Sequence, residues 1–376
     1  MNNRDNRENE NQEPSEQPGG PGTLRLVAWE ITRNCNLSCI HCRAAATCGP
    51  YTGELDTKAS FRLLEQISEV GRPIVILTGG EPLLREDIFD IAAYGTKLGL
   101  RMVMAPNGTL ITGKTAKQMA DSGIQRISVS LDGSSAESHD GFRGVSGAFD
   151  SAISGIETAK AAGIEFQVNT TITRNNKDEI PKILALAENL GAAALHIFLL
   201  VPTGRGKYII DQSITARQYE ETLNWFYDQK KNTSLQLKAT CAPHYYRILR
   251  QRARAEGKSV SVQTHGLDAV TRGCLGGTGF CFVSHRGIVQ PCGFLDLNCG
   301  DVTESSFADI WQNSEIFESL RDFDRLKGKC GICEYKRVCG GCRARAYEAT
   351  GDWLAEEPLC TYQPGKKQQA GAEQES

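Results

Sequence analysis

Three cysteines near the N-terminus are spaced in a way that suits iron–sulfur chemistry. Cys35, Cys39 and Cys42 directly follow the apolar run 24–31, with three and then two residues between them. Soft thiolate ligands select iron–sulfur clusters or zinc, and a [4Fe–4S] cluster is normally held by four of them. A triplet leaves one iron with an open site, where a small molecule can bind and be reduced. The alternative interpretation is a buried helical stripe, since positions i, i+4 and i+7 share one helix face.

Short β-branched runs alternate with amphipathic stretches between residues 24 and 256, and this alternation predicts the elements that position the cysteines. Apolar strands alternating with helices are typical of an α/β fold with a parallel sheet and right-handed crossovers. Six or seven such units favour a full or partial (β/α) barrel, although the pattern alone does not exclude an open Rossmann-type sheet. The predicted strands are 24–32, 73–78, 101–105, 126–131, 165–171, 194–201 and 235–240.

Polar or glycine residues follow five consecutive predicted strands. In (β/α) barrels the active site forms at the carboxyl ends of the strands, so these residues would converge on one mouth. Each of them alone has a simpler explanation as a turn or a bulge, but together they favour a site. In chain order the strand ends carry the cysteine triplet, Gly79-Gly80-Glu81, Asn107-Gly108, Ser130 with Asp132, and Asn169 with Thr170.

A second group of cysteines marks a change of pattern from about residue 260. Glycine- and cysteine-rich sequence predicts a smaller domain that lacks a large core and is held together by metal. Paired C-x2-C motifs commonly bind zinc, and cysteines alone do not distinguish zinc from a cubane cluster. We predict a disordered leader over 1–22, a barrel over 23–258, a cysteine-rich domain over 259–364 and a disordered tail over 365–376.

Composition excludes several classes of partner. The 376 residues carry a formal charge of −3, which gives no overall attraction to nucleic acid or to anionic membranes. The longest apolar stretch, 192–201, is too short to span a bilayer, and the polar N-terminus is not a secretory signal. Fourteen cysteines without such a signal favour metal chemistry in a reducing cytoplasm over a disulfide framework. We therefore expect a cytoplasmic protein with no nucleic-acid partner and no membrane span.

The triplet after the first strand, together with Gly79-Gly80-Glu81 after the second, resembles the radical S-adenosylmethionine (SAM) enzymes. The resemblance implies a partial barrel in which the triplet cysteines hold a catalytic [4Fe–4S] cluster, whose open iron chelates the amino and carboxylate groups of SAM. It also implies that the segment from Gly79 to Glu81 contacts the methionyl amine. By position, the further candidates for SAM contacts are Asn107, Ser130, Arg143 and Asn169.

The C-terminal cysteines resemble the SPASM extension of that superfamily, which in full members carries two auxiliary [4Fe–4S] clusters. The pattern is Cys274-x12-Gly287-x4-Cys292, then a central group and Cys360, although the last spacing of the central group is x2 where the family usually has x3. The resemblance implies a first auxiliary cluster on Cys274, Cys281, Cys292 and Cys342, and a second on Cys330, Cys333, Cys339 and Cys360. It assigns no role to Cys48 or Cys299, and Cys241 is either a substrate-proximal thiol or a buried strand-end residue.

A closer resemblance extends over residues 24–364. The strings LRLVAWEITRNCNLSCIHCRA, HIFLLVPTGRG, KATCAPHYYRILRQRA and TRGCLGGTGFC resemble the haem-forming radical enzymes of the alternative, sirohaem-derived pathway, best those of the haem b synthase type. This implies oxidative decarboxylation of two propionates of iron-coproporphyrin III to vinyl groups, with a flavodoxin or ferredoxin as electron donor. The alternatives are a didecarboxysirohaem deacetylase or haem d1 precursor enzyme, a SPASM peptide-modifying enzyme, and a non-enzymatic electron-transfer or zinc-binding module.

A tetrapyrrole substrate with several propionates requires cations and a flat, partly apolar pocket. Arginine suits carboxylates because its planar fork binds them in bidentate fashion. His244 either ligates the iron of the macrocycle or packs at a helix N-terminus. The candidate substrate residues are Arg205, Lys207, His244, Tyr245, Tyr246, Arg247 and Arg272.

Overall fold

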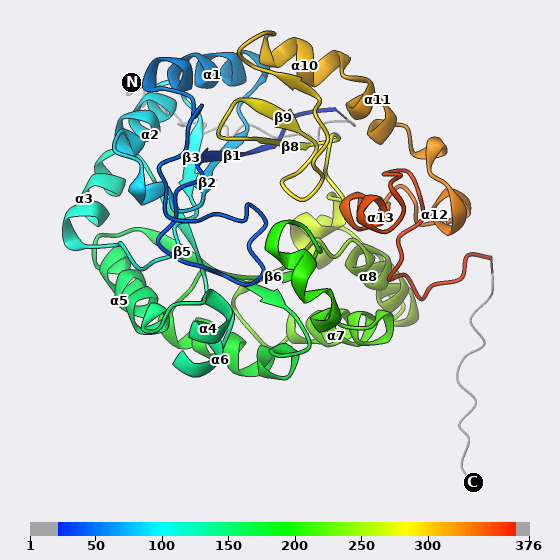
Figure 1. Cartoon of the computed structure of the whole chain (residues 1–376). Coiled ribbons are helices and arrows are strands. Elements are labelled where there is room, and N and C mark those ends of the chain that lie inside the picture. The colour runs from blue at the N-terminus through cyan, green and yellow to red at the C-terminus, as the bar shows by residue number, and fades with distance from the viewer. Residues whose placement is uncertain (1–21, 366–376) are drawn as a thin grey trace, which may run out of the picture.

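Seven strands expected from the sequence form the parallel frame of the molecule (Figure 1). The computed structural model describes residues 22–365, so the predicted leader and tail lie almost entirely outside the described residues. Each strand begins and ends within two residues of its predicted bounds. The strands are β1 (Leu26–Thr32), β2 (Ile74–Gly79), β3 (Arg101–Met104), β4 (Arg126–Ser130), β5 (Glu165–Ile172), β6 (Ala194–Leu199) and β7 (Gln236–Thr240).

Helices connect these strands and cover the outside of the sheet, as the ring of coils in Figure 1 shows. Helix α1 (Thr57–Val70) begins after Asp56, whose side chain accepts a hydrogen bond from the Ala59 N–H (2.7 Å), and Gly71 follows its last residue. The other helices are α2 (Ile88–Lys97), α3 (Gly113–Asp121), α4 (Ala136–Arg143), α5 (Ala148–Ala161), α6 (Ile180–Leu190), α7 (Ala216–Gln229), α8 (His244–Ala255), α9 (Val262–His265), α10 (Phe307–Asn313), α11 (Glu315–Arg321), α12 (Gly328–Ile332) and α13 (Arg343–Thr350).

The sheet is an open barrel rather than a closed one. Its strand order is β10-β9-β8-β1-β2-β3-β4-β5-β6-β7, so β7 forms one edge and β10 the other. The strands therefore follow chain order from β1 to β7 with the helices outside, which confirms the partial (β/α) barrel and excludes the Rossmann-type sheet.

Side chains of the sheet alternate between an outer face packed on the helices and an inner face that lines the barrel interior. Residues such as Leu195 on the outer face are fully buried in the main hydrophobic core. On the inner face the register pairs Ser130 with Asn169, Asn169 with His196, and His196 with Lys238. A row of polar side chains thus crosses the interior from β4 to β7.

The cysteine-rich C-terminal region joins the same sheet. Strand β8 (Phe280–Val283) pairs in parallel with β1, and β9 (Ile288–Gln290) and β10 (Gly300–Asp301) continue from it in antiparallel fashion. Val283, Val289 and Phe307 are fully buried in the main core. The packing is therefore continuous across residues 258 and 259, where the sequence predicts a division, and the expectation of a region without a large core is wrong for this part.

No helix within residues 22–365 is both long and apolar enough to cross a membrane.

Candidate active site and cysteine clusters

The loop after β1 gathers the three N-terminal cysteines in one buried cluster. Cys35 and Cys39 are buried and Cys42 packs against the same small apolar group. The backbone N–H groups of Leu37 and Ala46 donate to the sulfurs of Cys35 and Cys42, each at 3.4 Å. The residues form a loop rather than a helix, so the alternative of a helical stripe is wrong. N–H donors aimed at sulfur suit thiolates that carry negative charge.

The Cys35 thiol is protonated when no metal is bound. Burial raises the pKa of the Cys35 thiol to about 11. The hydrogen bond from the Leu37 N–H acts in the opposite direction and lowers this pKa, and the neighbouring Glu81 carboxylate raises it. A bound metal centre removes such protons, because a coordinating thiol is deprotonated outright. Within residues 22–365, no three His, Cys, Asp or Glu side chains are grouped to hold a single metal ion. In a cubane each thiolate binds a different iron, so the triplet needs no such grouping and fits a [4Fe–4S] cluster.

The segment after β2 lies directly against the triplet loop. A Cβ on Gly80 would approach the Asn34 carbonyl oxygen to 2.3 Å, so only glycine permits this contact. The Glu81 N–H donates to the same oxygen at 2.8 Å, and the Glu81 carboxylate accepts from the Asn107 N–H at 2.6 Å. The Asn107 side chain in turn donates to the Asn36 side chain at 2.8 Å. Three predicted strand ends therefore meet at one place.

The Gly80→Ala substitution is expected to damage this junction severely. Its methyl group would collide with backbone, which cannot move aside like a flexible side chain, so the β2 segment must shift away from the cysteine loop. We expect SAM affinity to fall by at least about tenfold, which corresponds to about 1.4 kcal/mol. Equilibrium binding of SAM to the reconstituted protein measures this. The matched control is Gly113→Ala, because a Cβ there meets nothing within 4 Å; an equal loss of affinity in both variants would contradict the prediction.

Glu81 should make the stability of the cluster-free protein depend on pH. It is fully buried, and burial raises its pKa from 4.5 to about 7, so the folded state favours the protonated form. The contribution of Glu81 to the free energy of unfolding is fully present below pH 4.5 and is lost as the pH rises through about 7. The expected loss is about 3 kcal/mol, and urea unfolding at about pH 5 and pH 8 measures it. A Glu81→Gln variant should lack this component; an unchanged pH dependence would contradict the assignment.

The remaining predicted SAM-contact residues divide into two groups. Arg143 joins the triplet directly: it donates to the Cys39 sulfur (3.5 Å) and forms a buried ion pair with Asp132 at 2.5 Å. Ser130 and Asn169 lie side by side on β4 and β5, and the side-chain oxygen Oδ1 of Asn169 accepts from the side chain of Gln167 at 3.0 Å. The structure thus brings Arg143 to the cluster site and places the other two along the barrel interior.

Sequence reasoning missed two residues of the barrel interior. They are His196, which interrupts the apolar stretch 192–201, and Lys238. Burial lowers the pKa of His196 to about 3 and also lowers the pKa of Lys238, although Asp268 raises the latter slightly. The available signal was a polar residue in the middle of each of several adjacent apolar strands.

The predicted substrate residues are mostly engaged elsewhere. Arg205 braces the triplet loop, donating to the Cys39 and Ala46 carbonyl oxygens at 2.7 and 2.6 Å. Arg247 forms a bidentate ion pair with Glu220, and Tyr245 is fully buried against Phe226. These side chains are held by protein partners in this structure, and their assignment to the substrate stays a prediction.

The other basic and aromatic candidates contact neighbouring side chains. The guanidinium carbon of Arg272 lies 3.8 Å from the centroid of the Phe323 ring, and its Nε and Nη1 atoms have no hydrogen-bond partner within residues 22–365. Lys207 forms an ion pair with Glu348 at 3.1 Å. Tyr246 is buried edge-on against Tyr245. None of these positions identifies a porphyrin pocket.

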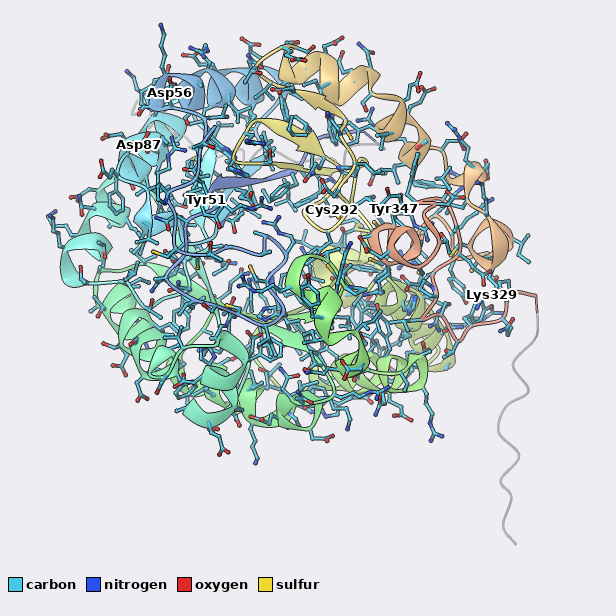
Figure 2. The ribbon with its side chains drawn as sticks, in the orientation of Figure 1. Tyr51, Asp56, Asp87, Cys292, Lys329 and Tyr347 are labelled. Carbon is cyan, nitrogen blue, oxygen red and sulfur yellow. The ribbon has the colours of Figure 1, made fainter. Side chains whose placement is uncertain are left out.

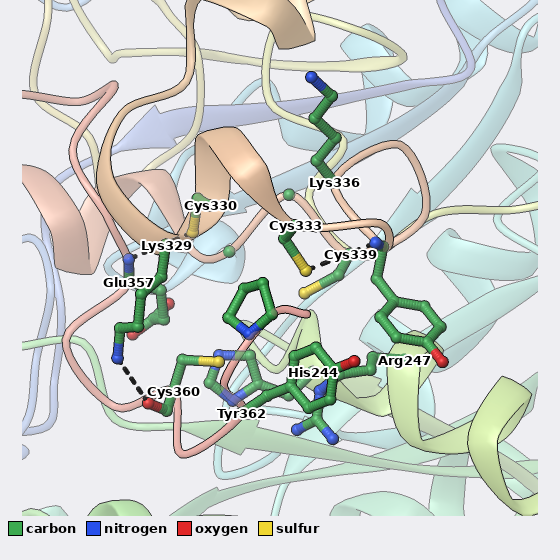
Figure 3. A pocket seen from close by; sticks show the side chains of 14 residues that line it. His244, Arg247, Lys329, Cys330, Cys333, Lys336, Cys339, Glu357, Cys360 and Tyr362 are labelled. Carbon is green, nitrogen blue, oxygen red and sulfur yellow. Dashed lines mark hydrogen bonds between the residues drawn. The ribbon is translucent and has the colours of Figure 1, made fainter. Parts of the chain in front are cut away.

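The four cysteines predicted for the second auxiliary cluster line one cavity, whose empty space of about 380 Å³ includes part of the open solvent. Figure 3 shows the sulfurs of Cys333, Cys339 and Cys360 around this space, with Cys330 at its rim. The Glu357 N–H donates to the Cys330 sulfur and the Tyr335 N–H to the Cys333 sulfur, each at 3.4 Å. These four thiols fit a cubane with four ligands.

His244 faces this cavity rather than an open substrate pocket (Figure 3). Its ring is completely buried, and neither ring nitrogen has a hydrogen-bond partner in the described part of the chain. Burial lowers its pKa to about 3, so the ring is neutral. A role as a ligand of a porphyrin iron does not fit this position.

Three of the four cysteines predicted for the first auxiliary cluster lie together. Burial raises the pKa of Cys292, and Cys274 and Cys342 raise it further, as charges do only at short range. Figure 2 places Cys292 on the inner side of the ring, beside Tyr347 of α13, with which it shares a small buried cluster. Cys281 does not join them, since its side chain lies in the main core.

Comparison with known proteins agrees with this arrangement. Residues 29–187 match the family model of the radical SAM superfamily, and residues 274–343 match SPASM, an iron–sulfur cluster-binding domain. The fold is similar to that of Streptococcus suis SuiB bound to its precursor peptide SuiA (TM-score 0.72, 18% identity, 90% of this chain and 76% of that chain). It is also similar to anSMEcpe with bound AdoMet and a peptide (TM-score 0.64, 21% identity, 89% and 93%). At such identities these likenesses establish the fold alone.

Relatives in sequence are much nearer. The AdoMet-dependent heme synthase of Oleidesulfovibrio alaskensis is 58% identical over 93% of this chain and 90% of its own length. The AdoMet-dependent heme synthase of Methanosarcina barkeri is 55% identical over 91% of this chain and 98% of its own length. The Fe-coproporphyrin III synthase of the same organism is 30% identical over 89% of this chain and 87% of its own length.

The fold, the cysteine triplet and the two family matches define a radical SAM enzyme with a SPASM extension, which uses a [4Fe–4S] cluster, SAM and auxiliary iron–sulfur clusters. Within that superfamily the chain belongs to the family of the AdoMet-dependent haem synthases.

Proposed function

We propose that this enzyme converts two propionates of iron-coproporphyrin III into vinyl groups and so forms haem b. The observation that carries the proposal is the identity of 55–58% to curated AdoMet-dependent heme synthases over at least nine-tenths of each chain. Relatives with other printed names, such as the pre-heme d1 synthase of Dinoroseobacter shibae at 31%, are far more distant. The mycofactocin maturases of Mycobacterium tuberculosis, at 29%, are equally distant, so peptide modification is disfavoured.

The reaction needs a radical because the β-carbon of a propionate carries no acidic hydrogen. When bound, the triplet cluster and SAM supply a radical able to remove such a hydrogen, chemistry that side-chain bases lack. The protein contributes the cradle: Arg205 and Arg143 hold the cysteine loop from two sides. Glu81 and Asn107 fix the neighbouring strand ends against it.

The substrate would occupy the polar interior of the barrel. Lys238 and His196 lie in the row that crosses β4 to β7, and the charged group resolved near Lys238 is Asp268, which forms its ion pair with Lys230. The ammonium group of Lys238 suits a propionate carboxylate. The negative charge of that carboxylate would raise the lowered pKa of Lys238 again. This assignment replaces the arginines expected from the sequence.

Each decarboxylation also releases one electron. Loss of a hydrogen atom and carbon dioxide from a propionate leaves a vinyl group and a single electron, which needs an acceptor. Arg43, next to Cys42, donates to the carbonyl oxygen of Gly293, next to Cys292, at 3.4 Å, and the Cys274 N–H donates to the Cys339 carbonyl oxygen at 3.3 Å. These contacts support the auxiliary clusters as the exit route, in order from the barrel interior outward. A flavodoxin or ferredoxin in the cytoplasm would supply the initiating electron.

The test is an anaerobic assay of the reconstituted protein with iron-coproporphyrin III, SAM and a strong reductant, read by mass spectrometry of the tetrapyrrole. Two successive losses of a carboxyl group are the expected result. Abundant 5′-deoxyadenosine with an unchanged porphyrin would overturn the proposed substrate. Didecarboxysirohaem would then be assayed in its place, because deacetylation of that compound is the next candidate reaction.

A further inference from the structure

Cys281 and Cys299 form a pair that is separate from the other C-terminal cysteines. Cys281 lies on β8 opposite Val27 of β1 and is completely buried in the main core. Cys299 packs against the same core, and Arg321 lies close to both thiols. Cys274, Cys292 and Cys342 are therefore left one ligand short of a fully ligated cubane.

A different cysteine stands beside those three. Cys241 packs in the same small buried cluster as Cys292 and Cys342, together with Val201 and Leu295. The Cys241 thiol also lies close enough to the thiols of Cys342, Cys292 and Cys274 to interact with them electrostatically, whereas no such interaction with Cys281 is resolved. Cys241 thus lies beside the other three thiols, although it comes from the barrel and they come from the SPASM region.

The backbone at Cys241 is held in an unfavourable conformation. Its φ of +52° lies in the left-handed region, which side chains other than glycine rarely adopt. The carbonyl oxygen of Cys241 accepts hydrogen bonds from Arg345 at 2.7 Å and from the Tyr219 hydroxyl at 3.2 Å. Buried Arg345 belongs to α13, which begins directly after Cys342. Strain of this kind persists where surrounding structure imposes it, and it often marks a functional position.

We propose that Cys241 is the fourth ligand of the first auxiliary cluster, together with Cys274, Cys292 and Cys342, and that Cys281 and Cys299 bind no iron. The thiolate of Cys241 would complete the ligation of this cluster, so that it has no open iron and serves electron transfer rather than substrate binding. The barrel strand β7 would then be tied to the SPASM region through iron. The inference concerns ligation alone, so its outcome does not depend on which porphyrin the enzyme uses.

The experiment compares four full-length proteins reconstituted anaerobically: wild type, Cys241→Ala, Cys281→Ala and Cys292→Ala. Iron and sulfide content and the Mössbauer and EPR spectra are measured, with circular dichroism to check folding. We expect Cys241→Ala and Cys292→Ala to lose about four irons, or to convert one cubane into a three-iron cluster. Cys281→Ala is expected to match the wild type, because its thiol lies in the main core.

Wild-type iron content and spectra in Cys241→Ala would overturn the proposal, whatever Cys281→Ala does. Loss of a cluster in Cys281→Ala but not in Cys241→Ala would restore the ligand set expected from the sequence. Should Cys241→Ala fail to fold, Cys241→Ser supplies the second test, since an oxygen ligand would alter the EPR signal of one reduced cluster only. An unaltered spectrum of a folded Cys241→Ser protein would equally count against the ligation.

Discussion

Replacement of Cys39 by alanine is expected to abolish both the cleavage of SAM and the consumption of porphyrin. Cys39 is buried beneath Arg143, which donates to its sulfur, and two remaining thiolates would leave the cluster under-ligated. We expect both rates to fall by more than about 10³-fold, as when an essential catalytic group is removed. The measurement is the yield of 5′-deoxyadenosine and of decarboxylated porphyrin in the anaerobic assay.

The matched control for this prediction is Cys48→Ala. Cys48 lies in the same loop region but is exposed and belongs to none of the three cysteine sets. Its rates should equal those of the wild type. Residual turnover in Cys39→Ala at a tenth of the wild-type rate or more would refute the assignment of the triplet as the catalytic cluster site.

Replacement of Cys339 by alanine should instead separate the two halves of the reaction. Cys339 is buried in the cavity with Cys330, Cys333 and Cys360, whereas the triplet packs in a separate cluster, so SAM cleavage should continue. Vinyl formation should fall by about 10²-fold or more, because the electron left by decarboxylation has no acceptor. The ratio of 5′-deoxyadenosine to vinyl product, measured in one assay, reports this separation directly.

Cys299→Ala controls for the general loss of a cysteine from the same region, and its product ratio should be unchanged. Equal loss of deoxyadenosine and vinyl product in Cys339→Ala would show that the second cavity supports the fold or the first cluster. Its proposed role as an electron acceptor would then be wrong.

Sequence patterns were sufficient for the strands and for two of the three cysteine sets. Continuous apolar runs marked each parallel strand, and the short spacing of the triplet left little freedom in where its thiols could lie. The same holds for Cys330, Cys333 and Cys339, which share one cavity as expected.

The first auxiliary set could not be predicted in full. The strand Phe280–Val283 is apolar at every position, so no alternation reveals that Cys281 points into the core. Cys241 precedes Cys274 by 33 residues, and only the meeting of β7 with the SPASM region brings the two together. The protein partners of the arginines expected to bind substrate could not be predicted for a similar reason, because a partner such as Glu220 of Arg247 is distant in sequence.

The pairing of β8 with β1 has a consequence for how this chain can be made and cut. Because Leu26 pairs with Phe280, the backbone groups along one edge of β1 remain unpaired until about 250 further residues have been synthesised. Glu30, beside the cysteine loop, likewise waits for His285, which donates to it at 2.7 Å. A fragment ending at residue 258 would therefore expose an apolar strand edge and leave a buried carboxylate short of a partner. Such a fragment should aggregate rather than fold as an independent barrel.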